Sequence, residues 1–278
     1  MGIVTTASGA RIAWDAFGDK TLPPMILIQG FSAQMVGWRP GFCQRLADEG
    51  FHVIRFDNRD VGQSQRYPQG GYALSDLADD TAAFLDAMDI KSAHIVGQSM
   101  GGMIAQLLAA QHPSRVRSLG LIYTAANSSH YLSRDVIEER MARPLPTTRE
   151  EYVSYYVANE EGCASSGYPQ DVAWLAELAG VIWDRGWDAE GTQRQLEALM
   201  SAPDRDQALS EIRVPTMLIA GKADQLINSD ATEEIHKLIP GSKLKIFPGM
   251  GHELPQPLWS EIAELLAENA RSANSKAQ

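Results

Sequence analysis

Hydrophobic positions along the chain fall into two alternating patterns. Short runs rich in β-branched and aliphatic residues predict buried strands, and between them apolar residues recur every three or four positions, as in amphipathic helices. This alternation is typical of a mostly parallel sheet with helices on both faces. The predicted strands are 11–17, 25–29, 52–57, 94–98, 116–123, 216–221 and 243–247, preceded by a first strand near 3–6. The predicted helices are 38–49, 74–88, 100–111, 231–238 and 259–271.

The alternation stops between residue 127 and about residue 213. Only helical stretches are predicted there, over 134–141, 149–160, 173–182 and 192–199. A long segment without strands inside a sheet domain is typical of a functional insertion. This segment leaves the sheet at the carboxyl end of a strand, where open α/β sheets bind ligands. We therefore expect a core domain formed by residues 1–127 and 214–278 and a helical cap formed by residues 128–213.

A candidate nucleophile lies between a predicted strand and a predicted helix. The pattern is Gly-x-Ser-x-Gly, with Gly97, Ser99 and Gly101 at its fixed positions. A serine at such a tight turn has a strained backbone, and glycines two residues to either side avoid collisions with neighbouring chain. The amide of Met100, at the start of the helix, would point toward an oxyanion formed at Ser99. The pattern predicts a nucleophile elbow.

A serine hydroxyl needs a neighbouring base, and an acid that orients the base. His252 lies in a glycine-rich loop directly after the last predicted strand, and Asp224 follows the strand before it. The other five of the six histidines fall at strand starts, at a helix end or on segments expected to be exposed, which favours structural roles for them. We expect Ser99, His252 and Asp224 to be the catalytic residues.

The second oxyanion donor and the substrate pocket are expected in two places. The loop after strand 25–29 offers the amide of Phe31, with Gly30 allowing a close turn and the Phe31 ring lining the acyl side of the pocket. Together with Met100, Phe31 would form the oxyanion hole. In the cap, Trp183 and Trp187 are further pocket candidates, with packing of the cap on the core as the competing interpretation.

Composition narrows the range of partners. The chain has 35 acidic and 24 basic residues, a net charge of -11, which argues against nucleic acid and anionic membrane surfaces as partners. Cys43 and Cys163 provide neither a disulfide framework nor a metal cluster, and we expect both to be buried in a protein of a reducing compartment. No targeting segment or membrane span is predicted, so the expected location is cytoplasmic. We expect no metal and no cofactor, and leave homodimerisation open.

Four motifs in order along the chain resemble the α/β-hydrolase superfamily of serine hydrolases. They are the elbow at 97–102, the Phe-Asp-Asn-Arg-Asp-Val-Gly-Gln-Ser segment at 56–64, Gly-Lys-Ala-Asp at 221–224 and Gly-His at 251–252. The resemblance implies a mostly parallel eight-stranded sheet flanked by helices, with a helical cap inserted after the sixth strand. It also implies that Asp57, Arg59 and Asp60 are structural. Gln29 stands where many members carry histidine. The 29–31 and 56–60 segments are similar to those of polyketide methylesterases of the aclacinomycin type.

These observations predict an enzyme that hydrolyses carboxylic esters of small to medium, largely apolar molecules through an acyl-enzyme intermediate. Methyl esters are one candidate substrate class. Carbon-carbon bond hydrolases, lactonases and perhydrolases share the same triad and remain alternatives. A non-enzymatic ligand receptor on the same scaffold is a more remote one. Haloalkane dehalogenases and epoxide hydrolases are disfavoured, because they carry aspartate where Ser99 stands.

Overall fold

A computed structural model describes residues 1–130 and 144–273. The described residues form one eight-stranded sheet in the order β1-β2-β4-β3-β5-β6-β7-β8. Strand β2 pairs antiparallel with β1 and β4, and all other neighbours are parallel. The strands are β1 Gly2–Thr5, β2 Arg11–Phe17, β3 Pro24–Ile28, β4 His52–Phe56, β5 Ala93–Gln98, β6 Val116–Ile122, β7 Thr216–Gly221 and β8 Lys243–Phe247. Each predicted strand is confirmed to within one residue at either end.

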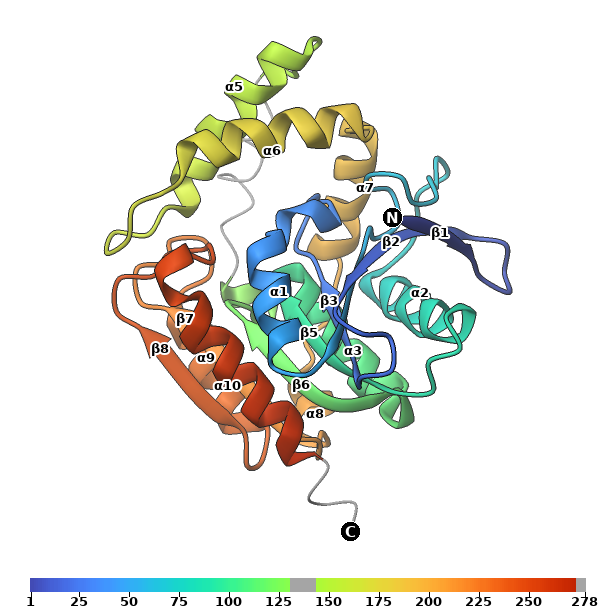
Figure 1. The fold of residues 1–278 in the computed structure, drawn as a ribbon, viewed down its shortest axis with the longest axis vertical. Coiled ribbons are helices and arrows are strands. Elements are labelled where there is room, and N and C mark those ends of the chain that lie inside the picture. The colour runs from blue at the N-terminus through green and yellow to red at the C-terminus, as the bar shows by residue number, and fades with distance from the viewer. Residues whose placement is uncertain (131–143, 274–278) are drawn as a thin grey trace.

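Helices cover both faces of the sheet (Figure 1). Helices α1 and α10 pack together on one face, and α2, α3, α8 and α9 follow one another across the other. The helices are α1 Pro40–Asp48, α2 Leu74–Ala87, α3 Met100–Gln111, α5 Arg149–Glu160, α6 Val172–Asp184, α7 Ala189–Met200, α8 Asp206–Ser210, α9 Ser229–Leu238 and α10 Trp259–Ser272. Short 3-10 helices span Met35–Gly37, Pro113–Arg115, Ser128–His130, Glu161–Cys163 and Gln256–Leu258. This arrangement confirms the α/β-hydrolase architecture expected from the motifs.

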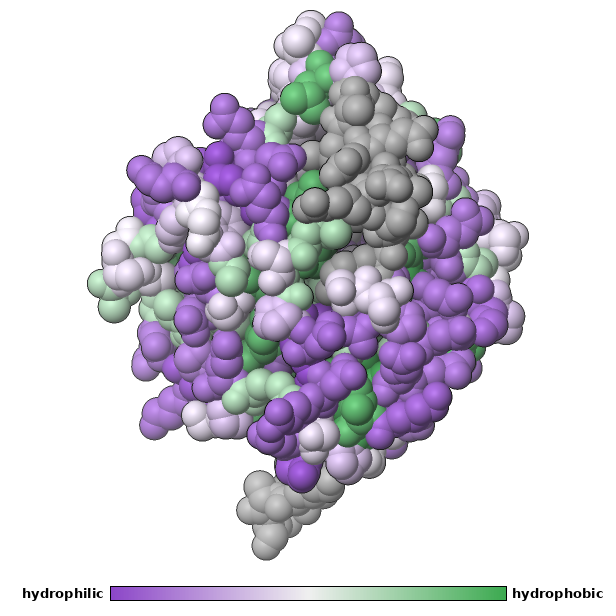
Figure 2. Space-filling model, turned by 180° about the vertical axis from the view of Figure 1, so that it is seen from behind, coloured by the Kyte–Doolittle hydropathy of each residue, from purple (hydrophilic) through white to green (hydrophobic). Residues whose placement is uncertain are grey.

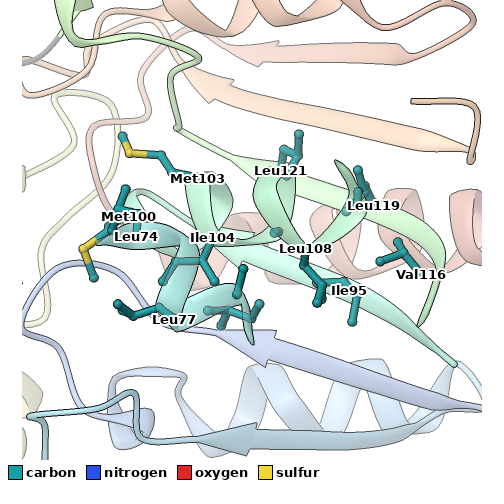
Figure 3. Packing of buried hydrophobic residues seen from close by; sticks show 14 of the residues in the cluster. Leu74, Leu77, Ile95, Met100, Met103, Ile104, Leu108, Val116, Leu119 and Leu121 are labelled. Carbon is teal, nitrogen blue, oxygen red and sulfur yellow. The ribbon is translucent and has the colours of Figure 1, made fainter. Parts of the chain in front are cut away.

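Helix α3 is buried on almost all sides, which explains why its sequence is apolar nearly all round. Met103, Ile104 and Leu108 pack between β5, β6 and α2 (Figure 3). Fully apolar helices of this kind occur in the centre of large cores. The burial fixes α3 on the sheet, and with it the residue that precedes its first turn, Ser99.

The long segment between β6 and β7 is helical, as expected. Helices α5, α6 and α7 gather beyond one end of the sheet (Figure 1). The helix predicted over 134–141 lies outside the described residues. Helix α8 differs from the other three, because it packs against α3 and α9, and Leu209 and Ile212 belong to the main core cluster. We therefore propose that the cap ends before α8, somewhat earlier than residue 213.

The surface is mainly hydrophilic on the face away from the viewer of Figure 1. On the face shown in Figure 2, hydrophilic side chains dominate and apolar ones form only small patches between them. No helix among residues 1–130 and 144–273 has the length and hydropathy that crossing a bilayer requires. Cys43 is buried, as predicted, but the prediction for Cys163 is wrong, because this residue is only half-buried at the end of a cap helix.

Candidate active site

Ser99 sits at a sharp turn between β5 and α3. Its backbone has φ 53° and ψ -126°, a region that residues with side chains rarely adopt. A Cβ on Gly97 would lie 2.2 Å from the carbonyl oxygen of Gly101, and a Cβ on Gly101 would lie 2.2 Å from that of Ile28. The structure therefore contains the close approaches that the motif predicted, and a side chain at either glycine would collide there. The glycines let β5, α3 and the end of β3 approach closely at the serine.

Hydrogen bonds from the neighbouring strand hold the elbow in this conformation. The Ser99 amide donates to the carbonyl of Ile122 at 2.9 Å, and the Thr124 hydroxyl donates to the carbonyl of Ser99 at 2.8 Å. Strained conformations persist where the surroundings determine them in this way. The first amide of α3, that of Met100, has no partner within the helix because of its position, and its role as an oxyanion donor stays a prediction.

Asp224 and His252 form a hydrogen-bonded pair at the same edge of the sheet. The imidazole Nδ1 lies 2.7 Å from Asp224 Oδ2, while Oδ1 accepts from the amides of Leu226 and Ile227 at 2.8 and 2.9 Å. The aspartate side chain is fully buried and that of His252 is 10% exposed. The carboxylate is thus fixed by its own loop and can hold the imidazole in one orientation. The sequence predicted this pair.

Two loops cross closely to bring the pair together. A Cβ on Gly221 would lie 2.1 Å from the carbonyl oxygen of Met250, and the Ala223 amide donates to that same oxygen at 2.9 Å. Tyr123, which follows Ile122 at the end of β6, packs its ring on the imidazole of His252 with centroids 4.5 Å apart. Within the described residues, no hydrogen bond joins Ser99 to His252. In enzymes without bound substrate this contact is often long.

The predicted oxyanion turn lies directly against the serine. A Cβ on Gly30 would be 3.2 Å from Ser99 Cβ and 3.7 Å from its Oγ. The Ala33 amide donates to the Gly30 carbonyl at 3.3 Å, which closes a turn over Phe31 and Ser32. Phe31 is half-buried, with its ring against the main core cluster.

Gln29 belongs to a polar network that runs beneath the nucleophile. Its Oε1 accepts from the Gly30 amide at 2.8 Å and from Gln98 Nε2. Gln98 Oε1 in turn accepts from the Tyr123 hydroxyl at 2.6 Å. Gln29 is 2% exposed, so these bonds satisfy a side-chain oxygen that would be costly to bury unpaired. The sequence marked Gln29 as a departure from the superfamily, but gave no sign of its partners.

The cap contacts the loop that carries His252. The Gly251 amide donates to Ser165 Oγ at 3.0 Å, and the Ser165 amide donates to Glu253 Oε1 at 2.8 Å. Gly167 and Gly249 touch backbone to backbone, since a Cβ on either would lie within 2.7 Å of the other's Cα. The base is therefore supported by residues from the inserted segment as well as by Asp224.

The cap is also joined to the segment after β4 by buried ion pairs. Arg185 Nη2 lies 2.5 Å from Asp57 Oδ2, and Arg194 makes a bidentate contact with Asp60 at 3.0 and 2.8 Å. Asp57 Oδ1 also accepts from the Met35 amide at 2.7 Å, which connects it to the chain following the oxyanion turn. These contacts fit the structural role that the resemblance implied for Asp57 and Asp60. Arg59 pairs with Asp80 on α2 instead.

Trp183 and Trp187 pack within the cap. Their rings stack with centroids 5.9 Å apart, and both contact Tyr152 of α5 at 5.6 and 4.8 Å. Both are half-buried. The packing interpretation accounts for these contacts, and the assignment of either tryptophan to the substrate pocket stays a prediction.

A cap carboxyl that the sequence analysis missed lies near the base. Glu160 is the last residue of helix α5, and burial raises its pKa to about 7. Nearby His252 acts to lower this pKa, and Glu253 acts to raise it further. Tyr152, Tyr156 and Glu160 are spaced four residues apart, so they share one face of α5. That spacing is visible in the sequence and would have been the signal to find Glu160.

The other histidines with hydrogen-bond partners have structural surroundings. His94 is buried against Ser118, with its pKa lowered to about 4 by burial. His112 and His130 contact Asp79 and Glu234 at 2.6 and 2.8 Å. Over residues 1–130 and 144–273, no group of three His, Cys, Asp or Glu side chains is arranged to hold a metal ion.

Comparison with known proteins identifies the fold family of the chain. The family model for the alpha/beta hydrolase fold matches residues 23–162, half of the chain. The chain is 27% identical to rhodomycin D methylesterase DauP of Streptomyces sp. (strain C5), covering 93% of this chain and 94% of that protein. It is 31% identical to the putative carbamate hydrolase RutD of Azorhizobium caulinodans, covering 84% and 85%.

A solved structure shows the same fold over the full length. The esterase EaEST of Exiguobacterium antarcticum superposes with a TM-score of 0.81 at 23% identity, over 98% of this chain and 100% of that one. With the family model and both relatives, the strained serine and the paired Asp224 and His252 lead to one conclusion. The chain belongs to the α/β-hydrolase fold family.

Proposed function

We propose that this protein hydrolyses carboxylic esters by covalent catalysis at Ser99. The observation that carries the proposal is the hydrogen-bonded pair of Asp224 and His252, at the edge of the sheet where strained Ser99 begins helix α3. A nucleophile with a base that is oriented by an acid forms the arrangement that serine hydrolases of several folds use. The methylesterase and esterase names among the relatives favour an ester as the substrate.

The reaction runs in two steps. His252 takes the proton from the Ser99 hydroxyl as its oxygen attacks the ester carbonyl, and the resulting oxyanion lies between the amides of Phe31 and Met100. The imidazolium then protonates the leaving alcohol, and the acyl group stays on Ser99. Water, deprotonated by His252, attacks the acyl-enzyme and releases the acid. Asp224 keeps the imidazole in the required tautomer and stabilises its charged form.

The proposed substrate is a small to medium ester with a largely apolar acyl group. Support comes from half-buried Phe31, which follows Gly30 in the turn against Ser99, and from the aromatic cluster in the cap, which includes Tyr152 and half-buried Trp183 and Trp187. A methyl ester is the narrower candidate, because DauP is named a rhodomycin D methylesterase. We propose that the protein acts in the cytoplasm.

The test measures turnover and labelling of the wild type and Ser99→Ala. Wild type should hydrolyse a short p-nitrophenyl ester with a burst of phenolate and bind a fluorophosphonate covalently at Ser99. Ser99→Ala should lose both. Ser114→Ala, a change at an exposed serine, is the matched control and should behave as wild type. Undiminished hydrolysis by Ser99→Ala would overturn the proposal.

A substrate panel separates the alternatives that share the triad. It should contain p-nitrophenyl esters of several chain lengths, methyl esters of polycyclic acids, lactones, carbamates and a ring-cleavage dienoate. A carbon-carbon bond hydrolase would turn over the dienoate far faster than any ester, whereas the proposed esterase would not. Failure to turn over any member, with no burst, would favour a ligand receptor.

A further inference from the structure

Two glutamine side chains hold the oxyanion turn from opposite sides. The Gly30 amide donates to Oε1 of Gln29 at 2.8 Å, and the Ser32 amide donates to Oε1 of Gln195 at 2.9 Å. Between them lies the amide of Phe31, which has no partner within the part of the chain that the structure describes. These bonds fix the Gln29–Gly30 and Phe31–Ser32 peptides, which flank the Gly30–Phe31 peptide. The N–H of that central peptide, on Phe31, is the one left to bind a substrate oxygen.

The turn needs this support, because Ser32 has a strained backbone. Its φ of 55° lies in the left-handed region, which residues other than glycine, asparagine and aspartate rarely enter. Without a partner for its amide, the peptide between Phe31 and Ser32 would be free to rotate toward a more favourable conformation. That rotation would also redirect the neighbouring Phe31 amide.

Gln195 reaches the turn from helix α7 of the cap, more than 160 residues further along the chain. Its side chain is fully buried, and its Nε2 donates to the carbonyl of Arg59 at 2.8 Å. The preceding residue, Arg194, makes a separate contact with the core, a bidentate ion pair with Asp60. Both ends of the Gln195 amide are thus engaged, so its oxygen has a single orientation, toward Ser32.

We infer that Gln195 is a positioning residue, through which cap helix α7 sets the direction of the Phe31 amide in the oxyanion hole. The inference rests on the proposed function, since the amide matters only where an oxyanion forms. Hydrogen bonds in such a hole strengthen as charge develops, so they stabilise the transition state more than the bound ester. Loss of the alignment should therefore lower kcat and leave KM nearly unchanged.

The central test is Gln195→Met, which has a similar length but neither accepts from Ser32 nor donates to Arg59. We expect kcat to fall roughly 10- to 100-fold, which is no more than the loss caused by removing an oxyanion donor altogether. KM should stay within about twofold of the wild-type value. Affinity for a trifluoromethyl ketone, which forms an oxyanion on Ser99, should fall by a similar factor. Affinity for the product acid should not change. All rates are divided by the concentration of active sites, which is measured by titration with a fluorophosphonate.

Gln195→Glu provides the conservative variant. Its carboxyl can accept from Ser32 and, when protonated, donate to the Arg59 carbonyl, so it should recover a large part of the kcat and of the ketone affinity lost in Gln195→Met. Urea unfolding of both variants shows separately whether either has a folding defect. Equal losses in the two variants would overturn the inference. On the same helix, exposed Gln193→Met is the matched control and should behave as wild type.

Arg194→Met separates the Ser32 contact from general attachment of the cap. It removes the contact with Asp60 and should lower stability while ketone affinity is retained. If Arg194→Met reproduced the selective loss of ketone affinity, or if Gln195→Met matched wild type in kcat and ketone affinity, the inference would be wrong. If Ser99→Ala is inactive but Gln195→Met has wild-type activity, the inference about Gln195 fails while the proposed esterase function stands. Equal hydrolysis by wild type and Ser99→Ala would instead refute the esterase.

Discussion

Tyr123 packs its ring on the imidazole of His252, with centroids 4.5 Å apart, while its hydroxyl donates to Gln98 beside the nucleophile at 2.6 Å. One side chain therefore contacts both the proposed base and the residue that precedes the nucleophile. Burial raises the pKa of Tyr123 well above its ordinary value, with the charge of Asp224 adding to the effect. The phenol is thus a permanent donor at neutral pH.

Tyr123→Phe keeps the ring and removes this donor. Because Gln98 Oε1 would lose its partner, we expect the free energy of unfolding to fall by about 1–3 kcal/mol and kcat to fall only a fewfold. Tyr123→Ala also removes the ring, so a loss of about 3–5 kcal/mol and a larger drop in kcat should follow. Urea unfolding and ester kinetics measure both. Equal kcat losses in the two variants would show that the hydroxyl, and not the ring, supports His252.

Glu160 should make stability depend on pH. Its pKa is about 7 in the folded chain and 4.5 ordinarily, so between these values the folded state binds the proton more tightly than the unfolded state. The contribution of Glu160 to the free energy of unfolding is therefore greatest below pH 4.5. It declines as the pH rises to about 7, by up to about 3 kcal/mol.

Urea unfolding of Glu160→Gln at several pH values tests this. The variant should lose that decline, whereas Glu150→Gln, at an exposed acid on the same helix, should keep it. A decline of wild-type size in Glu160→Gln would contradict the assignment.

Asp224→Asn should separate the orientation of the His252 imidazole from the folding of the loop that carries residue 224. The amide oxygen can still accept from Leu226 and Ile227, so the loop should stay folded. Its NH₂ group, however, would face Nδ1 of His252 and favour the wrong tautomer. We expect kcat to fall on the order of 10³- to 10⁴-fold with unchanged thermal stability. Stopped-flow ester hydrolysis and calorimetry measure the two effects. A loss of less than tenfold would remove Asp224 from the proposed mechanism.

Gly97→Ala should destabilise the fold through a direct collision. Its Cβ would lie 2.2 Å from a backbone oxygen that cannot move aside without shifting α3, so we expect a loss of about 3 kcal/mol or more. Gly50→Ala is the matched control. Gly50 has φ 94° but open space around it, and should lose only about 1–2 kcal/mol. Equal losses in urea unfolding would show that the close approach at Gly97 is not limiting.

The fold followed from the sequence because its determinants are local. Periods of two and of three to four residues predicted the strands and most helices, and the glycines at 97 and 101 predicted a close approach that the structure contains. The pairing of Asp224 with His252 was also predictable, since both follow adjacent parallel strands whose carboxyl ends meet at one edge.

The contacts made by the cap were not predictable, because nothing local encodes them. Gln195 and Arg185 look like ordinary polar residues of surface helices, yet both bury their side chains against loops far away in the chain. Trp183 and Trp187 were named as pocket candidates because they fall in the predicted cap, a position that suits packing as well as binding. Cys163 was expected to be buried because it fits neither a disulfide framework nor a metal cluster, but it is only half-buried at the end of a short helix.

The backbone contact between Gly167 and Gly249 limits how this protein can be re-engineered or diverge. A cap taken from a relative would have to present glycine at the position of Gly167, and the recipient would have to keep Gly249, because a side chain on either would push the segments apart. His252 lies three residues beyond Gly249, so such a mismatch would displace the base along with the cap. New specificities should therefore arise more readily by changing side chains within the existing cap than by exchanging it whole.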